Sequence, residues 1–209
     1  MTPDEVRRQF HVPRETMARL SCFAALLRRW TAKINLISNA TVADIWGRHI
    51  ADSLQLFALS RPDDRSWIDM GAGGGLPGMI IAAAAAEMHP SMHVTLIEAD
   101  HRKAAFLWTA ARALAVDVTV LDDRIEAITP RPFDVVSARA LAPLPTLLSY
   151  AQLFSGERTI CLFPKGARHK TELTLAEVDW HIDCEAVPSV TDPTAAILKI
   201  REFSPRHDR

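Results

Sequence analysis

The sequence predicts an α/β fold in which helices cover both faces of a mostly parallel sheet. Two observations carry this prediction: short apolar runs alternate with helical stretches of about 10 to 15 residues, and a glycine-rich loop separates the first run from the first such helix. Two strand-like runs near the end of the chain, joined by a turn at 191–193, favour an antiparallel edge. We therefore expect a doubly wound, seven-stranded sheet.

The first 60 residues are expected to form a helical cap. Apolar side chains recur every three or four residues from Met17 to Trp30 and again from Val42 to Phe57, as they do on one face of a helix. A polar turn at 61–65 ends this region. We expect an N-terminal cap over residues 1–60 and an α/β domain over residues 61–209, packed as one structural unit.

The elements of the α/β domain follow in order along the chain. Strands are expected at 67–70, 93–97, 116–121, 133–137, 159–163, 180–187 and 195–200. Helices are expected in three of the connections, at 76–88, 102–114 and 144–154. The tryptophans at 30, 46 and 67 are expected in the core, and Trp108 is expected to be buried as well.

Composition places the chain among ordered globular proteins. Of its 209 residues, 48% are hydrophobic and 23% are charged, which excludes a disordered chain. The longest apolar stretch, at 76–86, is shorter than the roughly 18 residues that a membrane span requires. Residues 1–10 mix acids and bases and show no signal pattern. We expect a cytoplasmic protein that does not enter a membrane.

Charge and cysteine usage narrow the expected partners. The net charge of −1 argues against indiscriminate binding to polyanions, although the 24 Lys and Arg residues can still gather on one face. Cys22, Cys161 and Cys184 are far apart and outside any CxxC pattern, so core thiols are expected in place of a disulfide or a zinc site. No metal is expected, and nothing in the sequence demands more than a monomer.

The most informative segment is the glycine-rich loop, which holds five glycines within residues 71–78. Glycine permits positive φ angles and lets a ligand lie against bare backbone, and the helix that follows offers unpaired amide hydrogens. From Gly73 onward the letters also match GxGxxG, the dinucleotide fingerprint. A tight turn with no ligand is the structural alternative.

Two acidic residues bear on the choice of cofactor. Asp69 precedes Gly71, Gly73 and Gly75 in the spacing Asp-x-Gly-x-Gly-x-Gly, and an anion there is awkward beside a pyrophosphate but suits the amino group or sulfonium of S-adenosylmethionine. Glu98 ends the second strand, where a carboxylate can accept the ribose hydroxyls of either cofactor. Asp69 therefore favours S-adenosylmethionine over a nicotinamide cofactor.

The loop after the third strand is expected to face the same ligand, because the carboxyl ends of parallel strands meet at one edge of the sheet. Glu126 can receive the exocyclic amine of an adenine there, and Ile125 can cover the ring. A solvated loop of charged residues is the alternative.

After the fourth strand, residues 137–140 occupy the place expected for the methyl acceptor. This segment lacks the Asn/Asp-Pro-Pro-aromatic run of exocyclic-amine methyltransferases, and Cys161 is predicted inside a strand, not beside a substrate. An acceptor nitrogen with a free lone pair, such as guanine N7, needs neither device, and catalysis then depends on alignment. Arg139 is the candidate catalytic residue, bonding guanine O6 or a nearby phosphate. A surface ion pair with an acid such as Asp134 is the alternative.

These motifs together resemble the bacterial small-subunit ribosomal RNA guanine-N7 methyltransferases, a family also called glucose-inhibited division protein B. The resemblance spans about residues 30–200. It rests on Trp30-x-x-Lys-Ile-Asn-Leu36, Arg48-His-Ile-x-Asp-Ser-Leu54, Ile68-Asp-x-Gly-x-Gly-x-Gly-Leu-Pro-Gly78, Arg124-Ile-Glu126, Ser137-Ala-Arg-Ala140 and Lys165-Gly166. The order of these motifs is specific, although no single one of them is.

The family implies a Rossmann-like fold that uses S-adenosylmethionine and releases S-adenosylhomocysteine. It further implies methylation of N7 of a guanosine in the decoding region of 16S rRNA, guanine 527 in the usual numbering of that RNA. Whether the substrate is free RNA or the assembled small ribosomal subunit is left open. Carried over by motif, the residues that would line the cofactor site are Gly71, Leu76, Ile125, Glu126 and Arg139, the last at the junction with the substrate.

Basic residues near the expected cofactor site are candidates for contacts to RNA phosphates. They are Arg28, Arg29, Lys33, Arg48, Lys165, Arg168 and Lys170. Solvated helix ends are the alternative for each cluster. His49 and Asp52, three residues apart on one helix, are expected to form a hydrogen-bonded brace in preference to a catalytic pair.

Three other functions stay open at this point. They are a small-molecule or protein methyltransferase, a nucleotide-binding adaptor without catalysis, and a nicotinamide oxidoreductase. A methyltransferase for another substrate would share the cofactor loop but would lack the basic clusters.

Overall fold

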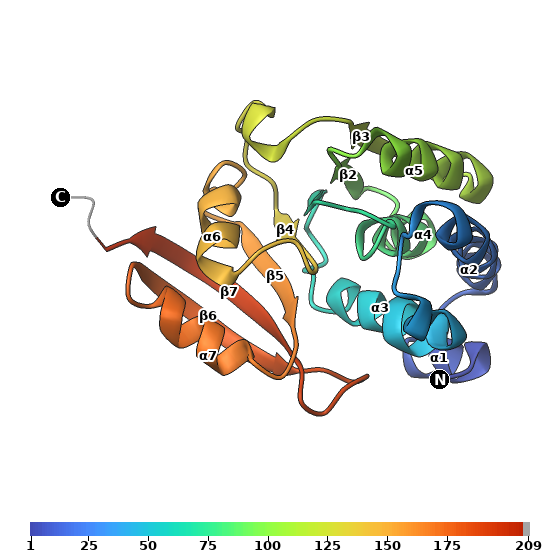
Figure 1. Cartoon of the computed structure of the whole chain (residues 1–209), viewed down its shortest axis with the longest axis horizontal. Coiled ribbons are helices and arrows are strands. Elements are labelled where there is room, and N and C mark those ends of the chain that lie inside the picture. The colour runs from blue at the N-terminus through green and yellow to red at the C-terminus, as the bar shows by residue number, and fades with distance from the viewer. Residues whose placement is uncertain (207–209) are drawn as a thin grey trace.

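The computed structural model describes residues 1–206 and shows one seven-stranded sheet with helices on both faces (Figure 1). The strand order is β3-β2-β1-β4-β5-β7-β6. The first five strands are parallel, and β7 runs antiparallel between β5 and β6. The strands are β1 Ser66–Met70, β2 His93–Ile97, β3 Val118–Leu121, β4 Val135–Ser137, β5 Ile160–Lys165, β6 Trp180–Pro188 and β7 Ala196–Pro205. The predicted fold class is confirmed.

Helical segments make up most of the first 57 residues and fill the connections between strands. The α-helices are α1 Pro3–Gln9, α2 Arg14–Ile34, α3 Asp52–Phe57, α4 Gly78–Met88, α5 His101–Leu114, α6 Leu144–Gln152 and α7 His169–Ala176. Two 3-10 turns, η1 Asn39–Asp44 and η3 Ile125–Ala127, and a π-helical turn, η2 Trp46–Ala51, complete the set. The expected helix at 42–57 is thus divided into η1, η2 and α3.

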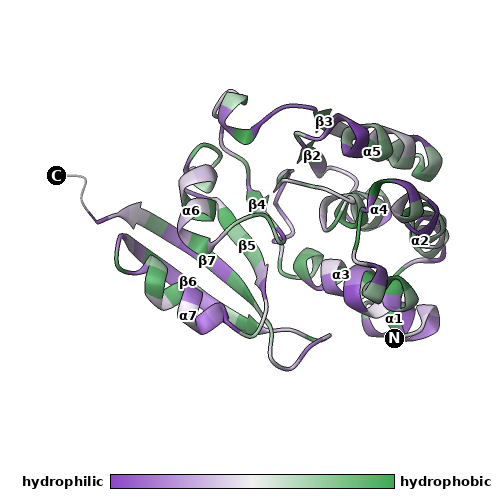
Figure 2. Ribbon diagram, in the orientation of Figure 1, coloured by the Kyte–Doolittle hydropathy of each residue, from purple (hydrophilic) through white to green (hydrophobic). Residues whose placement is uncertain are grey.

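Apolar side chains form two cores, one on each face of the sheet. Alternation along β1 places Trp67 in the core shared with α2, α4 and α5, and it places Ile68 and Met70 in the core shared with α6. Strands β4 and β5 are apolar along most of their length, whereas β6 and α7 carry polar stretches (Figure 2). The central strands are therefore covered on both faces, whereas the edge strand β6 is largely exposed.

Helix α4 positions the glycine-rich loop. Its first eight residues, 78–85, are all buried, because α2 and α3 pack against the side that does not face the sheet. A helix that is apolar all round needs this kind of enclosure. The helix begins at Gly78, two residues later than predicted, because residues 71–77 form turns before it.

Other differences from the sequence prediction lie at the ends of elements and on the surface. Helix α7 was not expected, because its apolar residues do not follow one face: Leu175 is 60% exposed, while Ala176 is buried. Strand β7 extends to Pro205, five residues beyond the predicted end. The prediction that Trp108 is buried is wrong, since it lies 44% exposed on α5.

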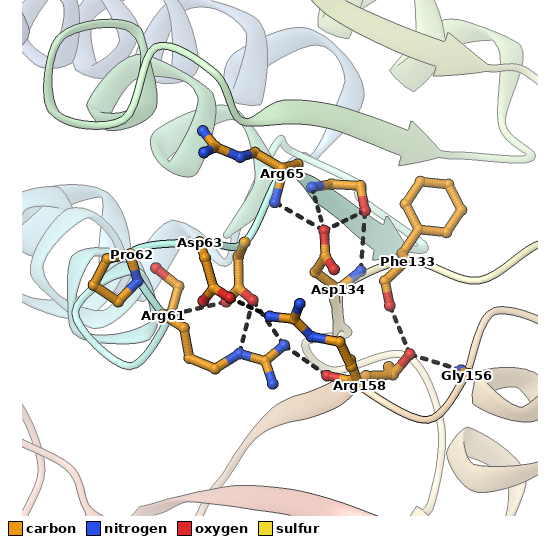
Figure 3. Close-up of polar contacts among 12 residues, drawn as sticks. Arg61, Pro62, Asp63, Arg65, Phe133, Asp134, Gly156 and Arg158 are labelled. Carbon is orange, nitrogen blue, oxygen red and sulfur yellow. Dashed lines mark hydrogen bonds and ion pairs between the residues drawn. The ribbon is translucent and has the colours of Figure 1, made fainter.

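The amino ends of β1 and β4 are held together by Asp134, which precedes β4 (Figure 3). Its Oδ2 accepts hydrogen bonds from the Arg65 amide at 2.8 Å, the Ser66 amide at 2.9 Å and the Ser66 hydroxyl at 2.8 Å. Burial alone would raise the pKa of Asp134, but these hydrogen bonds outweigh burial, so its pKa lies below the ordinary value. The carboxylate is therefore ionised, and its Oδ2 holds the two strand ends together.

A second group of contacts ties the turn before β1 to the turn before β5 (Figure 3). Arg61 Nε donates to Asp64 Oδ1 at 2.8 Å, and Arg61 Nη2 donates to the Arg158 carbonyl oxygen at 2.6 Å. Arg158 also pairs with Asp63. Each buried polar atom of these side chains has a partner within residues 1–206. We call these contacts and those of Asp134 the amino-end network.

Within residues 1–206, no helix is long and apolar enough to cross a membrane. The same residues contain no cluster of three or more His, Cys, Asp or Glu side chains arranged to hold a metal ion. All three cysteines are free: Cys161 is buried, and Cys22 and Cys184 are half-buried.

Candidate functional site

A cavity of about 530 Å³ opens where the parallel strands β1, β2, β3 and β4 end. This is the edge at which open α/β sheets bind ligands. Its walls include the glycine-rich loop, the residues after β2, the loop after β3 and the residues after β4. The predicted residues that line this first cavity are Gly71, Gly73, Leu76, Glu98, Ile125, Glu126 and Arg139.

The glycine-rich loop presents bare backbone to the first cavity. Gly71 and Gly73 have φ angles of +66° and +54°, which residues with a Cβ rarely adopt. A Cβ on Gly73 would meet only the Gly71 carbonyl oxygen, 3.7 Å away, whereas a Cβ on Gly71 would lie 2.6 Å from Leu141 Cδ1. The Ala72 amide donates to the Ile97 carbonyl at 2.8 Å and ties the loop to β2.

Two predicted cofactor ligands do not reach the first cavity. Asp69 is fully buried, and its two oxygens accept bonds from the Gly78 amide at 2.9 Å and the Ser137 hydroxyl at 2.8 Å. The expectation that Asp69 faces the cofactor is therefore wrong; it anchors the start of α4 instead. Gly75 is also buried, and a Cβ there would lie 2.9 Å from Met79 Cβ, so it serves packing. Burial raises the pKa of Asp69 to about 7.

Glu98 links the loop to the end of β2. Its Oε2 accepts from the Gly73 amide at 2.7 Å, and its Oε1 accepts from the Asp100 amide at 2.8 Å. The side chain lines the first cavity, although the residue is only 7% exposed. A carboxylate offers about four acceptor sites, so Glu98 can hold the loop and still accept hydroxyls from a ligand.

The wall after β3 combines an apolar residue with an anchored acid. Ile125 is 7% exposed and lines the first cavity. Glu126 Oε1 accepts from the Tyr150 hydroxyl at 3.0 Å and lies 3.5 Å from Arg124 Nη2. Hydrogen bonds from its own amide and from Tyr150 lower the pKa of Glu126, so its carboxylate is ionised. The wall thus offers a flat apolar contact beside a fixed acceptor.

Arg139 stands between the first cavity and a second one and lines both. Its Nη2 donates to the Arg48 carbonyl at 2.9 Å and to His49 Nδ1 at 3.1 Å, and its Nε lies 3.4 Å from Asp52 Oδ2. Its Nη1 is buried and has no partner within residues 1–206. Burial lowers the pKa of Arg139, and Asp52 partly offsets this. The predicted alternative was a surface ion pair with an acid such as Asp134; Arg139 does pair with an acid, but this acid is Asp52, the arginine is half-buried, and Asp134 belongs to the amino-end network.

His49 and Asp52 brace Arg139, not each other. His49 accepts from Arg139 at Nδ1, so its Nε2 carries the proton that bonds Thr41 Oγ1 at 2.8 Å, and Thr41 donates to the Ser38 carbonyl at 2.8 Å. Burial and the charges of Arg139 and Arg48 lower the pKa of His49 to about 4. His49 is therefore neutral near pH 7, and its lone pair is occupied.

The second cavity has a volume of about 620 Å³ and shares Arg139, Ala140 and Leu141 with the first. It brings together three of the basic residues predicted for RNA: Arg48, Lys165 and Arg168. Four others, Arg28, Arg29, Lys33 and Lys170, are exposed but line neither cavity. Lys165 Nζ pairs with Glu172 at 2.7 Å and its side chain is 9% exposed, so its ammonium is already engaged.

Sequence reasoning missed several residues of the first cavity. Lys103 lies in the first turn of α5, close after Glu98, and the rule that strand ends face the ligand was a usable signal for it. Ser38 follows α2 and reaches the cavity wall from the cap. Tyr150 lies in the middle of α6, and no sequence signal connects it with Glu126, 24 residues earlier.

Comparisons with known proteins agree with this geometry. A family model described as rRNA small subunit methyltransferase G matches residues 16–199. The chain is 46% identical over 206 residues to a ribosomal RNA small subunit methyltransferase G of Cereibacter sphaeroides, covering 98% of this chain and 99% of that protein. It is 49% identical to the protein of the same name in Gluconobacter oxydans, covering 92% and 96%.

Solved structures with low sequence identity share the fold. A methyltransferase from Geobacter sulfurreducens has a TM-score of 0.58 at 13% identity and covers 86% of this chain and 87% of its own. An O-methyltransferase from Bacillus cereus, solved with S-adenosylhomocysteine, has a TM-score of 0.58 at 16% identity and covers 87% and 91%. At these identities the likeness concerns the fold alone.

Proposed function

The chain belongs to the rRNA small subunit methyltransferase G family, and we propose that it methylates N7 of a guanosine in the decoding region of 16S rRNA. The methyl donor is S-adenosylmethionine, and the reaction takes place in the cytoplasm. The acceptor is presented by the RNA or by the small ribosomal subunit. The first cavity binds the donor, and the second receives the guanine.

The residues of the first cavity fit this donor. When bound, S-adenosylmethionine supplies an electrophilic methyl group on a sulfonium. The bare backbone at Gly73 admits a ligand in close contact, and Glu98 retains acceptor capacity for ribose hydroxyls. Ile125 and the anchored carboxylate of Glu126 suit the face and the amine of an adenine.

One observation carries the choice of N7. The wall between the two cavities holds Arg139, and the two groups beside it that could take a proton, His49 and Asp52, both accept contacts from Arg139. Methylation of an amine or a hydroxyl requires a proton to leave, whereas guanine N7 offers a lone pair with no proton. The two possible bases beside Arg139 are therefore occupied, which suits N7, and the residues at this wall act by alignment.

The buried cysteine argues against methylation of a pyrimidine carbon, which needs a thiolate nucleophile. Cys161 is fully buried in β5, and burial raises its pKa to about 12. The thiol is therefore protonated at neutral pH and out of reach of a substrate.

The proposal is tested by mapping the methyl group. Small ribosomal subunits from a strain that lacks this enzyme are incubated with the protein and methyl-labelled S-adenosylmethionine, and the RNA is digested and analysed by mass spectrometry. We expect one N7-methylguanosine, located in the decoding region. Label at another atom or in another region would contradict the proposal.

Two comparisons make this experiment specific. Protein-free 16S rRNA assayed in parallel identifies whether RNA or the assembled particle is the acceptor. Subunits from the parent strain, which already carry the modification, should take up no label.

A further inference from the structure

The second cavity is bounded by elements from both halves of the chain. Arg48 and Asp52 come from η2 and α3, Lys165 ends β5, and Glu172 belongs to α7. Its volume of about 620 Å³ lies in the range of small-molecule pockets and exceeds the needs of one base. The ligand that this cavity would recognise depends on which charged groups of its walls can still accept or donate a hydrogen bond.

Three ion pairs surround the second cavity, and in two of them both oxygens of the carboxylate have a partner. Asp52 accepts from Gln55, Thr191 and Arg139. Asp192 accepts from the Thr194 amide and hydroxyl and from Arg48.

Glu172 differs from these two acids. Its Oε2 lies 2.7 Å from Lys165 Nζ, while its Oε1 has no hydrogen-bond donor within residues 1–206. The side chain is 29% exposed and lines the cavity. Glu172 is therefore the carboxylate of this wall that can accept from a ligand.

Lys165 fixes Glu172 in place. Its side chain is 9% exposed, and its Nζ also donates to the Ala142 carbonyl at 3.1 Å. Ala142 follows directly after Arg139, Ala140 and Leu141, the three residues shared by the two cavities. Lys165 thus links Glu172 to the chain just after the residues shared by the two cavities.

Guanine matches an acceptor in this position. When its N7 and O6 edge faces the methyl donor, its N1–H and its 2-amino group lie on another edge, and both are donors. A carboxylate only accepts. Adenine has no 2-amino group and carries a lone pair at N1, which a carboxylate would repel.

We propose that Glu172, held by Lys165, reads the N1–H and 2-amino edge of the acceptor guanine and so determines base specificity. This proposal rests on the proposed function. A phosphate in the same place is disfavoured by the charge of Glu172; Arg168, which has no ion-pair partner within the described residues, is the better phosphate contact.

The test compares two acceptors that differ only in the 2-amino group. Small subunits are reconstituted with guanosine or inosine at the acceptor position, and kcat/KM for methyl transfer is measured with the wild type and with Glu172→Gln. The wild type should prefer guanosine about tenfold, as expected for one lost base-reading contact. Glu172→Gln should lose about tenfold on guanosine and little on inosine, because its amide nitrogen opposes the 2-amino group.

Glu177→Gln is the matched control. Glu177 lies just after α7, is exposed and lines neither cavity. Its substitution removes one negative charge, as Glu172→Gln does. It should keep the guanosine preference and the rate of the wild type. Glu172→Asp, which keeps the charge on a shorter side chain, should retain part of the preference. Thermal unfolding and S-adenosylmethionine affinity, measured for each variant, separate recognition from folding and donor binding.

The outcomes distinguish the two proposals. Equal losses on guanosine and inosine, no loss, or tighter binding of the RNA by Glu172→Gln would overturn the role of Glu172. If the wild type itself leaves no N7-methylguanosine on guanosine particles, it is the proposed function that fails.

Discussion

The two ends of the parallel strands use charged residues in opposite ways. At the amino ends, Asp134 accepts three hydrogen bonds, and the buried atoms of the amino-end network all have partners (Figure 3). At the carboxyl ends, Arg139 keeps a buried Nη1 without a partner, and Glu172 keeps a free oxygen within the described residues. The buried atoms of the amino-end network thus have partners, whereas Arg139 and Glu172 each keep an atom without one in the described part of the chain.

This difference distinguishes residues that stabilise the fold from residues that can bind a ligand. A buried donor left without a partner costs about 1–3 kcal/mol, and a ligand that bonds Arg139 Nη1 would remove this cost. The hydrogen bonds and ion pairs of the amino-end network are formed within the chain. We therefore expect the loss of a polar side chain at the carboxyl end to change activity more than stability, and the loss of one from the amino-end network to do the reverse.

Arg139→Ala should produce the largest effect. Removing a charged donor at the junction should lower methyl transfer by about 10² to 10³-fold, while the free energy of unfolding changes little, because the orphaned Nη1 is removed as well. Rates with labelled S-adenosylmethionine and thermal unfolding give the two readouts, and donor affinity is measured in parallel.

Arg158→Ala, which replaces an exposed arginine of the amino-end network, is the control and should keep full activity. Equal losses in the two variants would erase the contrast between the ends. If Arg139→Ala binds the donor and transfers the methyl group normally, the proposed role of Arg139 between the two cavities is refuted.

Gly71→Ala should strain the glycine-rich loop. A left-handed φ costs an alanine about 1–2 kcal/mol, and the clash with Leu141, 2.6 Å away, adds about 1–3 kcal/mol. We expect the free energy of unfolding to fall by about 2–5 kcal/mol in denaturant titrations, together with weaker donor binding in calorimetry. Gly166→Ala is the control for both measurements, because a Cβ there meets nothing within 4 Å.

Asp134→Ala should reduce stability and spare activity. It leaves the amides of Arg65 and Ser66 without their acceptor, which should cost about 1–3 kcal/mol in the free energy of unfolding. The rate of methyl transfer per folded molecule should match the wild type. Asp117→Ala, whose side chain is 97% exposed, should change neither quantity. A loss of activity at unchanged stability would mean that the two ends are coupled.

The sequence was a good guide to the fold because each layer leaves a periodic pattern. Alternating apolar runs placed the strands, and the glycine-rich loop placed the ligand edge, which the first cavity occupies. Helix α7 left no such pattern, since its apolar residue Leu175 is exposed. Glu172, which lies on that helix, was consequently not among the predicted site residues.

Asp69 shows why a motif places a residue along the chain better than in space. Its position before the glycines suggested contact with the cofactor, but side chains alternate along a strand, and Asp69 shares a face with Trp67 beneath α4. The alternation of side chains along a strand can be read from the sequence, and it would have placed Asp69 on the face toward Gly78. Tyr150 had no comparable signal, because only the tertiary arrangement brings α6 to Glu126.

The pH dependence of stability tests the corrected role of Asp69. Its pKa is about 7 in the folded chain and 3.8 in the reference state, because burial disfavours the ionised form. Between these values the folded form holds a proton that the unfolded form has released. This group therefore lowers the free energy of unfolding as the pH rises, by at most about 1.4 kcal/mol per pH unit.

Asp69→Asn removes this proton and keeps an acceptor for Gly78. The stability of the wild type relative to Asp69→Asn should therefore decrease from pH 5 to pH 8 in denaturant titrations. His49, whose pKa of about 4 gives the opposite slope between pH 4 and 6.5, is present in both proteins and cancels in the difference. Parallel stability curves for the two proteins would mean that the Asp69 carboxylate is ionised beneath the loop, and the amide and hydroxyl that bond it would then outweigh its burial.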